Sequence, residues 1–531
     1  MSLKVAVAGK TAAAVAATID ELVADKVASR IAAKDFTLWG KDAEAESSIR
    51  LGWVSSATDS APLVAGILAL RDEFAAKGIN RFVLCGMGGS SLAPEVITST
   101  AGVELVVLDS TNADQVGAAL SGDLARTAIV VSSKSGSTVE TDSQKRIFEQ
   151  AFSEAGIDKT DRVVIVTDPG SPMEAAAKAD GYRIFNADPT VGGRYSALTA
   201  FGLVPSGLAG ADISGLLAEA NAVAELLAAD DASNPGLILG AALARTANGS
   251  SFADKVGIVT DGTSIVGFGD WAEQLIAEST GKIGRGVLPV VLEPNSPELA
   301  VAANDLVIAR LVSDASSARE NEIAVSGPLG SQFLLWEFAT VVASRLLGIN
   351  PFDQPDVESA KVAARGMLEQ RAASIPAIFE ADNIEVRATE LNLDSATSIS
   401  SAIDALLAQI APDGYVSIQA YLDRTSVPQA SNLRDLIAAR TSRPVTFGWA
   451  PRFLHSTGQY HKGGPRQGVY LQIISAATQD IVVPGRDFTF GELIASQAAG
   501  DAKVLGDLGR PVLTLTLGEA TTGLAAVKNA I

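Results

Sequence analysis

Short apolar runs of strand length alternate with helix-like segments along much of this chain. The runs RFVLCG (81–86), AIVV (128–131) and RVVIVTD (162–168) are each followed by turn residues and then by a helical pattern. Strands that alternate with helices pair in parallel, and strands buried on both faces are continuously apolar. We therefore expect an α/β protein with parallel sheets that are covered by helices.

The pattern divides the 531 residues into three expected units. Residues 1–210 are expected to form N-terminal helices and a first domain, and residues 211–365 linking helices and a second domain. Residues 366–531 are expected to form a smaller C-terminal α/β region. Because no Gly/Ser-rich or Pro-rich linker precedes this region in the sequence, we expect it to pack against the other two.

The charge and the cysteine content limit which functions and which cellular compartment are expected for this chain. The chain has 41 Lys and Arg residues against 61 Asp and Glu residues, and the net charge of −20 repels a nucleic-acid backbone. The one cysteine, Cys85, lies in an apolar strand pattern, which favours a buried structural thiol and a reducing compartment. The apolar stretch 333–349 carries Glu337 and Arg345, as is typical of a core helix rather than a membrane span. We expect a cytoplasmic protein that binds neither nucleic acid nor membrane.

A glycine-rich segment, CGMGGSSLAPE (85–95), places Gly88, Gly89 and Ser90 between an expected strand and an expected helix. Glycines let the backbone approach an anion, and a helix N-terminus supplies free N–H donors. The same residues are equally suited to a tight structural turn, and their spacing is not the full dinucleotide-binding fingerprint. Taken alone, the segment leaves both interpretations open.

A hydroxyl-rich segment, SSKSGSTVET (132–141), follows the run AIVV. Backbone amides and hydroxyls at the start of a helix can bind a phosphate group. The alternative is that one hydroxyl caps the helix, with Glu140 in its first turn. Four hydroxyls and a glycine exceed what a cap requires, and GxxxxGK[ST] is absent here, so phosphate binding is favoured over nucleoside triphosphate hydrolysis. The candidate phosphate-binding side chains are Ser133, Lys134, Ser135, Ser137 and Thr138.

Five segments together resemble the motifs of glucose-6-phosphate isomerases, in the order of that family. They are GMGGSSLAPE, SSKSGSTVET, VGGRYS (191–196), AESTGK (277–282) and NPFDQPDVESAK (350–361). The resemblance extends from about residue 40 to residue 365, and it implies two sugar-isomerase (SIS) domains with parallel sheets in three-layer α/β/α sandwiches. The segment HSTGQYHKGGP (455–465) further resembles the isomerase half of transaldolase–isomerase fusion proteins.

The resemblance implies reversible isomerisation of D-glucose 6-phosphate and D-fructose 6-phosphate through a cis-enediolate, a step of glycolysis and gluconeogenesis. It also implies a homodimer. A proton shuttle between adjacent carbons requires neither a cofactor nor a metal. Two alternatives stay open: an isomerase that also accepts mannose 6-phosphate, and a non-catalytic sugar-phosphate-binding regulator.

The resemblance assigns chemical roles to three residues, each of which could otherwise be an ordinary surface or salt-bridged residue. It implies that Glu278 is the base that moves a proton between C2 and C1, that Arg194 stabilises the enediolate, and that Lys361 assists ring opening. Glu278 lies at the end of an expected helix, 265–278, where a carboxylate opposes the helix dipole and is suited to act as a base near neutral pH.

Histidine is where the sequence departs from the family pattern. The family has a ring-opening histidine between the glutamate and lysine motifs, but this sequence has none between Glu278 and Lys361. Its two histidines, His455 and His461, fall in one glycine-rich segment. We expect this segment to supply the ring-opening acid–base group, from its own chain or from a partner subunit. A metal site is disfavoured because no convincing ligand set accompanies the histidines.

Overall fold

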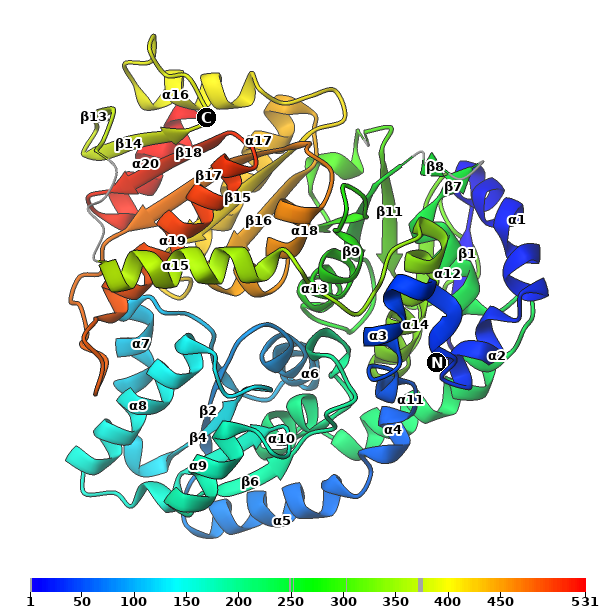
Figure 1. Ribbon diagram of the computed structural model, residues 1–531, viewed down its shortest axis with the longest axis horizontal. Helices are drawn as coiled ribbons and strands as arrows, with labels where there is room; N and C mark the ends of the chain where they lie inside the picture. The colour runs from blue at the N-terminus through cyan, green and yellow to red at the C-terminus, as the bar shows by residue number, and fades with distance from the viewer. Residues whose placement is uncertain (1, 248–249, 252, 302, 371–375) are drawn as a thin grey trace.

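The structure is a computed structural model, and it describes residues 2–247, 250–251, 253–301, 303–370 and 376–531. Three α/β units are visible in Figure 1. The first lies at the lower left, the second at the right, and the C-terminal unit at the upper left. This organisation confirms the expected fold class, with one sheet in each unit.

The first unit contains a five-stranded sheet in the order β3-β2-β4-β5-β6, and all of its neighbouring strands are parallel. Its strands are β2 (Arg81–Gly86), β3 (Val106–Leu108), β4 (Thr127–Ser132), β5 (Val163–Thr167) and β6 (Arg183–Asn186). Strands β4 and β5 are buried along their whole length, as continuous apolar runs predict. The helices of this unit are α5 (Leu63–Ala76), α6 (Leu92–Ala101), α7 (Ala113–Leu120), α8 (Val139–Glu154), α9 (Pro172–Asp180) and α10 (Ala200–Ala209).

The second unit contains a sheet in the order β1-β12-β11-β9-β10. Its strands are β1 (Lys4–Val7), β9 (Lys255–Thr260), β10 (Leu288–Leu292), β11 (Leu306–Leu311) and β12 (Ile323–Ser326). All neighbours are parallel except β1, which pairs antiparallel with β12. The expected first domain, 1–210, is therefore wrong at its beginning, because β1 belongs to the second sheet. An edge strand of four residues, half-buried or exposed, lacks the long apolar run that marks the buried strands.

The helices of the second unit come from two stretches of the chain, residues 9–59 and residues 213–347. They are α1 (Gly9–Ala24), α2 (Val27–Ala32), α3 (Glu44–Ser47), α4 (Ser56–Asp59), α11 (Ile213–Ala228), α12 (Pro235–Ala244), α13 (Phe268–Thr280) and α14 (Leu329–Leu347). A two-stranded ladder pairs β7 (Thr246–Ala247) with β8 (Ser250–Ser251). Helix α14 is buried on nearly all sides, which confirms the expected core helix over 333–349.

The C-terminal unit has a mixed sheet in the order β13-β14-β18-β17-β15-β16. Its strands are β13 (Phe379–Ala381), β14 (Ile384–Thr389), β15 (Tyr415–Tyr421), β16 (Val445–Trp449), β17 (Gly468–Ser475) and β18 (Val512–Leu517). Strands β15 to β18 are parallel to one another. Strand β14 pairs antiparallel with β18, and β13 pairs antiparallel with β14, which makes an antiparallel edge that the sequence did not predict. Its helices are α16 (Ile399–Leu407), α17 (Leu433–Thr441), α18 (Gly458–Gly463), α19 (Phe490–Asp507) and α20 (Ala520–Ala530).

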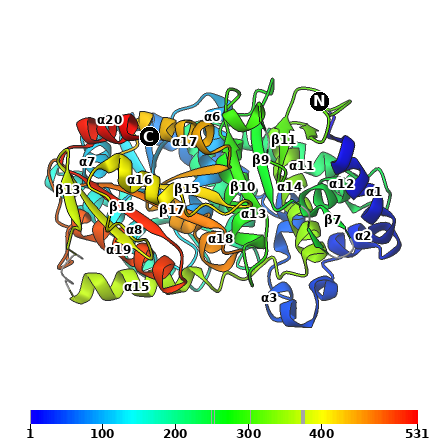
Figure 2. The same cartoon turned by 90° about the horizontal axis from the view of Figure 1, so that it is seen from above.

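The C-terminal unit packs on both other units, as the absence of a linker predicts. Thr111 of the first unit donates to the side chain of Gln497 at 2.8 Å, and Arg443 pairs with Asp305 of the second unit at 2.6 Å. Helix α15 (Val357–Gln370) connects the second unit to the third and packs along α19. Figure 2 shows α15 and α20 on opposite faces of the C-terminal unit.

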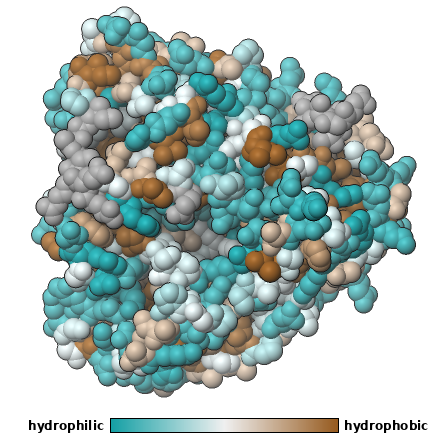
Figure 3. All heavy atoms as spheres, in the orientation of Figure 1, coloured by the Kyte–Doolittle hydropathy of each residue, from teal (hydrophilic) through white to brown (hydrophobic). Residues whose placement is uncertain are grey.

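The surface and the cysteine agree with the expectations from composition. Figure 3 shows a face on which hydrophilic side chains predominate and hydrophobic ones are scattered. Cys85 is fully buried in β2, and burial raises the pKa of its thiol, so it is a structural residue. Within the described ranges no single helix has the length and apolarity to cross a membrane, although the bent pair Gly52–Asp59 and Leu63–Ala76 together meet those two criteria.

Candidate functional site

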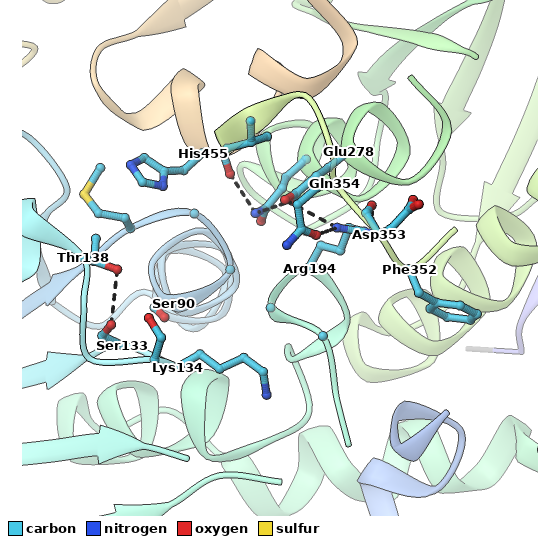
Figure 4. Close-up of a pocket in the computed structure, with 18 of the residues that line it drawn as sticks. Ser90, Ser133, Lys134, Thr138, Arg194, Glu278, Phe352, Asp353, Gln354 and His455 are labelled. Carbon is cyan, nitrogen blue, oxygen red and sulfur yellow. Dashed lines mark hydrogen bonds and ion pairs between the residues drawn. The ribbon is translucent and has the colours of Figure 1, made fainter. Parts of the chain in front are cut away.

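A cavity of about 750 Å³ receives residues from all three units (Figure 4). Eleven of the thirteen expected site residues line it. They are Gly88, Gly89, Ser90, Ser133, Lys134, Ser135, Thr138, Arg194, Glu278, Lys361 and His455. The fold therefore brings together motifs that lie more than three hundred residues apart in the sequence.

Two glycines of the turn η4 (Gly88–Ser90) allow three chain segments to meet at the cavity. Gly88 has a φ of +54°, and a Cβ atom there would lie 2.6 Å from the carbonyl oxygen of His455. A Cβ atom on Gly89 would lie 2.1 Å from the carbonyl oxygen of Gly193. A larger residue at either position would push the neighbouring segment away. These glycines are therefore needed for the cavity to assemble.

The hydroxyl-rich loop lies between β4 and α8 on the wall of the cavity. Thr138 is the N-cap residue of α8, but its side chain makes no capping hydrogen bond, so the capping interpretation is wrong. Its Oγ1 lies 3.3 Å from Oγ of Ser133, and Lys134 pairs with Asp168 at 2.6 Å beside them. Clustered hydroxyls and the free N–H groups of a helix N-terminus are suited to bind an anion.

Arg194 is buried at the base of the cavity, in the turn η7 (Gly193–Tyr195). Its Nε donates to the hydroxyl of Ser279 at 2.9 Å, and one terminal nitrogen donates to the carbonyl oxygens of Pro351 and Asp353 at 2.7 and 2.9 Å. The other terminal nitrogen lies 3.4 Å from a carboxylate oxygen of Glu278. A guanidinium held in this way keeps its charge and its orientation next to the carboxylate.

Glu278 lies two residues before the end of α13, and its side chain is 13% exposed, toward the cavity. Its second carboxylate oxygen accepts a hydrogen bond from Nε2 of Gln274 at 3.1 Å. The same amide nitrogen donates to the carbonyl oxygen of His455 at 2.8 Å. Gln274 thus joins the carboxylate of the second unit to the histidine segment of the third.

His455 ends the turn η10 (Arg452–His455) and enters the cavity from the C-terminal unit. Its Nε2 lies 2.9 Å from the carboxylate of Glu140, in the first turn of α8, which also accepts a hydrogen bond from Gln497 at 2.7 Å. Burial alone would raise the pKa of Glu140, but the charge and hydrogen bond of His455 outweigh it and lower that pKa. The pair is a carboxylate–imidazole dyad, an arrangement that orients the ring for proton transfer.

Two lysines lie close to the cavity in different surroundings. Lys361 is exposed on α15 and also lines a second cavity of about 190 Å³ between α15, α8 and α19. Lys282 is buried, and its ammonium group donates to the carbonyl oxygen of Asn350 at 2.6 Å and to the carboxylate of Asp353 at 2.7 Å. Burial and the charge of Arg194 lower the pKa of Lys282 to about 7.

Two expected site residues do not line the main cavity. The Ser137 hydroxyl lies 2.7 Å from that of Ser135 and faces the second cavity. His461 is buried inside the C-terminal unit, where its Nδ1 lies 2.9 Å from the hydroxyl of Tyr415 and its Nε2 lies 3.3 Å from that of Ser417. Of the two candidate histidines in this segment, His455 lines the main cavity, whereas His461 does not, because aromatic packing retains it in the core.

The sequence reasoning missed several residues of the cavity and one member of the dyad; among them, Gln274, Gln354 and Glu140 contact the expected catalytic side chains. Gln274 lies one helical turn before Glu278, a spacing that places both on one helix face and could have indicated it. Gln354 accepts a hydrogen bond from Arg194 at 2.7 Å and lies inside the NPFDQ segment already selected. Glu140 was considered only as a first-turn residue of a helix. In the part of the chain that the structure describes, no cluster of three or more His, Cys, Asp or Glu side chains is suited to a metal ion.

Residues 71–284 match the family model described as phosphoglucose isomerase. This part of the chain is similar to a phosphoglucose isomerase domain. The matched residues include the η4 turn, the hydroxyl-rich loop, Arg194 and Glu278, whereas Lys361 and His455 lie beyond them. The matched residues thus supply much of the cavity lining, and segments before and after them supply the remaining side chains, among them Glu46, Lys361 and His455.

Curated proteins similar to this chain are named glucose-6-phosphate isomerases. A probable glucose-6-phosphate isomerase of Haloarcula marismortui is 29% identical in an alignment 362 residues long, which covers 58% of this chain and 83% of that protein. The glucose-6-phosphate isomerase of Synechococcus elongatus is 27% identical in an alignment 376 residues long, which covers 60% of this chain and 71% of that protein. About two fifths of this chain lies outside each alignment.

Solved structures support the fold assignment. A hypothetical protein of Thermus thermophilus matches with a TM-score of 0.58 at 23% identity, over 69% of this chain and all of that one. A glucose-6-phosphate isomerase of Chlamydia trachomatis matches with a TM-score of 0.50 at 19% identity, over 62% of this chain and 75% of that one. The part of the chain that is similar to phosphoglucose isomerase therefore has a known α/β architecture, to which the C-terminal unit is joined.

Proposed function

We propose that this chain is a glucose-6-phosphate isomerase, which interconverts D-glucose 6-phosphate and D-fructose 6-phosphate through a cis-enediolate. The observation that carries the proposal is the placement of Glu278, Arg194, the hydroxyl-rich loop and His455 around one cavity. The family match and the named relatives support the same reaction. The reaction moves one proton between neighbouring carbons, for which a positioned carboxylate and a fixed cation are suited.

The substrate phosphate binds at the start of α8. Hydroxyls of Ser133, Ser135 and Thr138, and that of Ser90 in the same cavity, donate hydrogen bonds to its oxygens. Lys134 adds a positive charge nearby, although its ammonium group is partly neutralised by Asp168. Because the whole chain is acidic, this local cluster of N–H groups and hydroxyls is what attracts a dianion.

His455 opens the sugar ring, and Lys361 assists from α15. The imidazole moves a proton between the ring oxygen and the hydroxyl at the anomeric carbon, which breaks the bond between the ring oxygen and that carbon and leaves an open-chain carbonyl compound. Glu140 holds Nε2 and balances the charge of the imidazolium form. Both members of the dyad come from the same chain, so the partner-subunit origin considered for the histidine is not needed.

Proton transfer then falls to Glu278. Its carboxylate removes the proton at C2 of the open-chain aldose, and the electron pair moves through a C1–C2 double bond onto the carbonyl oxygen. Arg194, 3.4 Å from that carboxylate, stabilises the resulting oxyanion. Glu278 delivers its proton to C1 and the proton of the C2 hydroxyl passes to the C1 oxygen, which gives the ketose.

Turnover of fructose 6-phosphate, followed by a dehydrogenase that oxidises glucose 6-phosphate, tests the proposal. The Glu278→Gln variant should lose activity by about 10²- to 10⁴-fold, the usual worth of a positioned base. Glu273→Gln is the matched control, because Glu273 is buried on the same helix but does not line the main cavity. Sugar phosphate that binds to the wild-type chain without turnover would instead support the regulator, and turnover of mannose 6-phosphate would broaden the substrate range.

We also propose a cytoplasmic homodimer, on the resemblance to the family and on the buried lone thiol of Cys85. Because the dyad is complete within one chain, activity per chain should not fall when the protein is diluted below the dissociation constant of the dimer. Light scattering and activity measured over the same dilution series test this. The likeness of residues 455–465 to fusion proteins stays a prediction.

A further inference from the structure

The turn η10, which presents His455, is fixed at its first residue by a buried arginine. Arg452 is 7% exposed, and its Nε lies 2.5 Å from a carboxylate oxygen of Asp109. One terminal nitrogen pairs with Glu95, and the other lies 3.8 Å from Asp270. The turn that carries His455 is thus held by residues of the first unit, and not only by residues of the C-terminal unit to which it belongs.

Both principal carboxylates of this anchor are shared with a second arginine. Arg424, which follows β15, lies 2.8 Å from Glu95 and 3.5 Å from Asp109, and also donates to the carbonyl oxygen of Val107 at 3.0 Å. Burial would raise the pKa of Glu95, but the charges of Arg452 and Arg424 lower it to about 2. The Glu95 carboxylate therefore stays ionised throughout the physiological range.

The anchoring carboxylates are themselves attached to the cavity wall. Glu95 lies in the first turn of α6, which begins directly after the glycine-rich turn, and Asp109 directly follows β3. On the other side, the backbone of His455 is fixed by the amide of Gln274 and by the close approach of Gly88. Arg452 and these contacts thus hold the same short turn at its two ends.

We propose that Arg452 is a positioning residue that holds His455 in register with the cavity, and that Arg424 only docks the unit. The inference rests on the proposed function and extends it to a residue outside the part of the chain that matches the family model. The planar guanidinium of Arg452 bonds two carboxylates at once, Asp109 and Glu95, which gives a directional restraint that a lysine does not reproduce. A displacement of a catalytic group by about 1 Å can cost about a hundredfold in rate.

Arg452→Lys tests the proposal, with Arg424→Lys as the matched control on the same two carboxylates. We measure isomerisation of fructose 6-phosphate and, by exchange NMR, interconversion of the α and β anomers of glucose 6-phosphate, which reports ring opening alone. Arg452→Lys should lower kcat and the catalysed anomer exchange together by about a hundredfold, with KM within about twofold, since substrate binding is untouched. Arg424→Lys should leave both rates within about threefold of the wild type.

Two outcomes overturn the proposal: anomer exchange in Arg452→Lys equal to the wild type, or equal losses in both arginine variants in step with the melting temperature. If Arg452→Lys does not fold, Asp109→Asn removes one charged acceptor while keeping its shape, and the same comparison applies. Failure of the proposed function is distinguishable, because a wild-type chain that does not isomerise would show it directly. Glu278→Gln, in contrast, should keep anomer exchange while it loses isomerisation.

Discussion

The turn η10 and the helix α18 are neighbours in the C-terminal unit, and each carries one histidine. The surroundings of the two histidines differ. His455 borders the cavity, is 15% exposed and contacts Glu140 of the first unit. His461 is 1% exposed and lies between the hydroxyls of Tyr415 and Ser417 inside its own unit. One ring can reach substrate, and the other contacts protein groups on both nitrogens.

The difference teaches that a shared motif does not give two histidines a shared role. Burial, reinforced by the charges of Lys462 and Arg510, lowers the pKa of His461 well below its ordinary range. A neutral imidazole enclosed by the core exchanges no proton with substrate. An imidazole beside a carboxylate and open to a cavity is suited to that exchange. The partners that decide between these roles come from β15 and from α8, far away in the sequence.

The strongest test of the comparison is His455→Asn. We expect kcat on cyclic substrate to fall by about a hundredfold or more, because the general acid–base group for ring opening is removed. The melting temperature should also fall at neutral pH, because the buried carboxylate of Glu140 loses the charge and the hydrogen bond of His455. Steady-state kinetics and thermal unfolding of the same preparation check both statements, and unchanged kinetics would contradict the role of His455.

The next effect concerns the partner of that histidine. Glu140→Gln should lower kcat by about tenfold, the scale of one hydrogen bond to a charged group. Because His455 lowers the pKa of Glu140, the carboxylate contributes stability above its unfolded pKa and loses that contribution as the pH falls through the folded pKa. The melting temperature of the wild type should therefore exceed that of Glu140→Gln at neutral pH, and the gap should close in acid. A gap that is constant with pH would contradict the dyad.

His461→Asn should lower the stability of the protein and leave kcat nearly unchanged, unlike His455→Asn. The free energy of unfolding should fall by about 1–3 kcal/mol, because buried hydroxyls of Tyr415 and Ser417 lose a partner. The kcat of the folded protein should stay within about threefold of the wild type, since the ring does not line the cavity. Denaturant unfolding and kinetics on the folded fraction measure the two quantities. A large loss of kcat at unchanged stability would instead indicate that His461 takes part in catalysis.

The smallest expected effect is a pH dependence of stability from a second buried base, Lys282. Its pKa of about 7 in the folded state lies below the ordinary lysine value, so the unfolded chain binds more protons above neutrality. The stability of the wild type relative to Lys282→Met should therefore rise as the pH increases from about 7 toward 10. Thermal unfolding of both proteins across that range would show the trend, and a falling difference would contradict the lowered pKa.

Much of the fold could be predicted because buried parallel strands leave a direct signal. The runs that became β2, β4 and β5 are continuously apolar, and the hydroxyl-rich loop follows one of them at the sheet edge. The antiparallel strands β1, β13 and β14, at or next to a sheet edge, were missed, because half-buried strands have weaker patterns. The positions of strands were thus predictable where burial was complete.

The candidate site was predictable only in part, for a different physical reason. The resemblance selected Glu278 and Arg194, but it said nothing of the surroundings of either histidine. Glu140 and His455 lie 315 residues apart, and the contact between Arg452 and Asp109 spans 343 residues. Local patterning carries no information on such contacts, since they depend on how the third unit docks on the first. Only the structure could separate His455 from His461.

Isomerisation of fructose 6-phosphate in D₂O tests the central claim most directly. If Glu278 carries the proton between C1 and C2, the proton exchanges with solvent while it resides on the carboxylate. NMR should then show deuterium at C2 of the glucose 6-phosphate formed by the wild type, and neither product nor exchange with Glu278→Gln. Full turnover without any deuterium at C2 would mean a direct hydride shift between the carbons, and it would contradict the account.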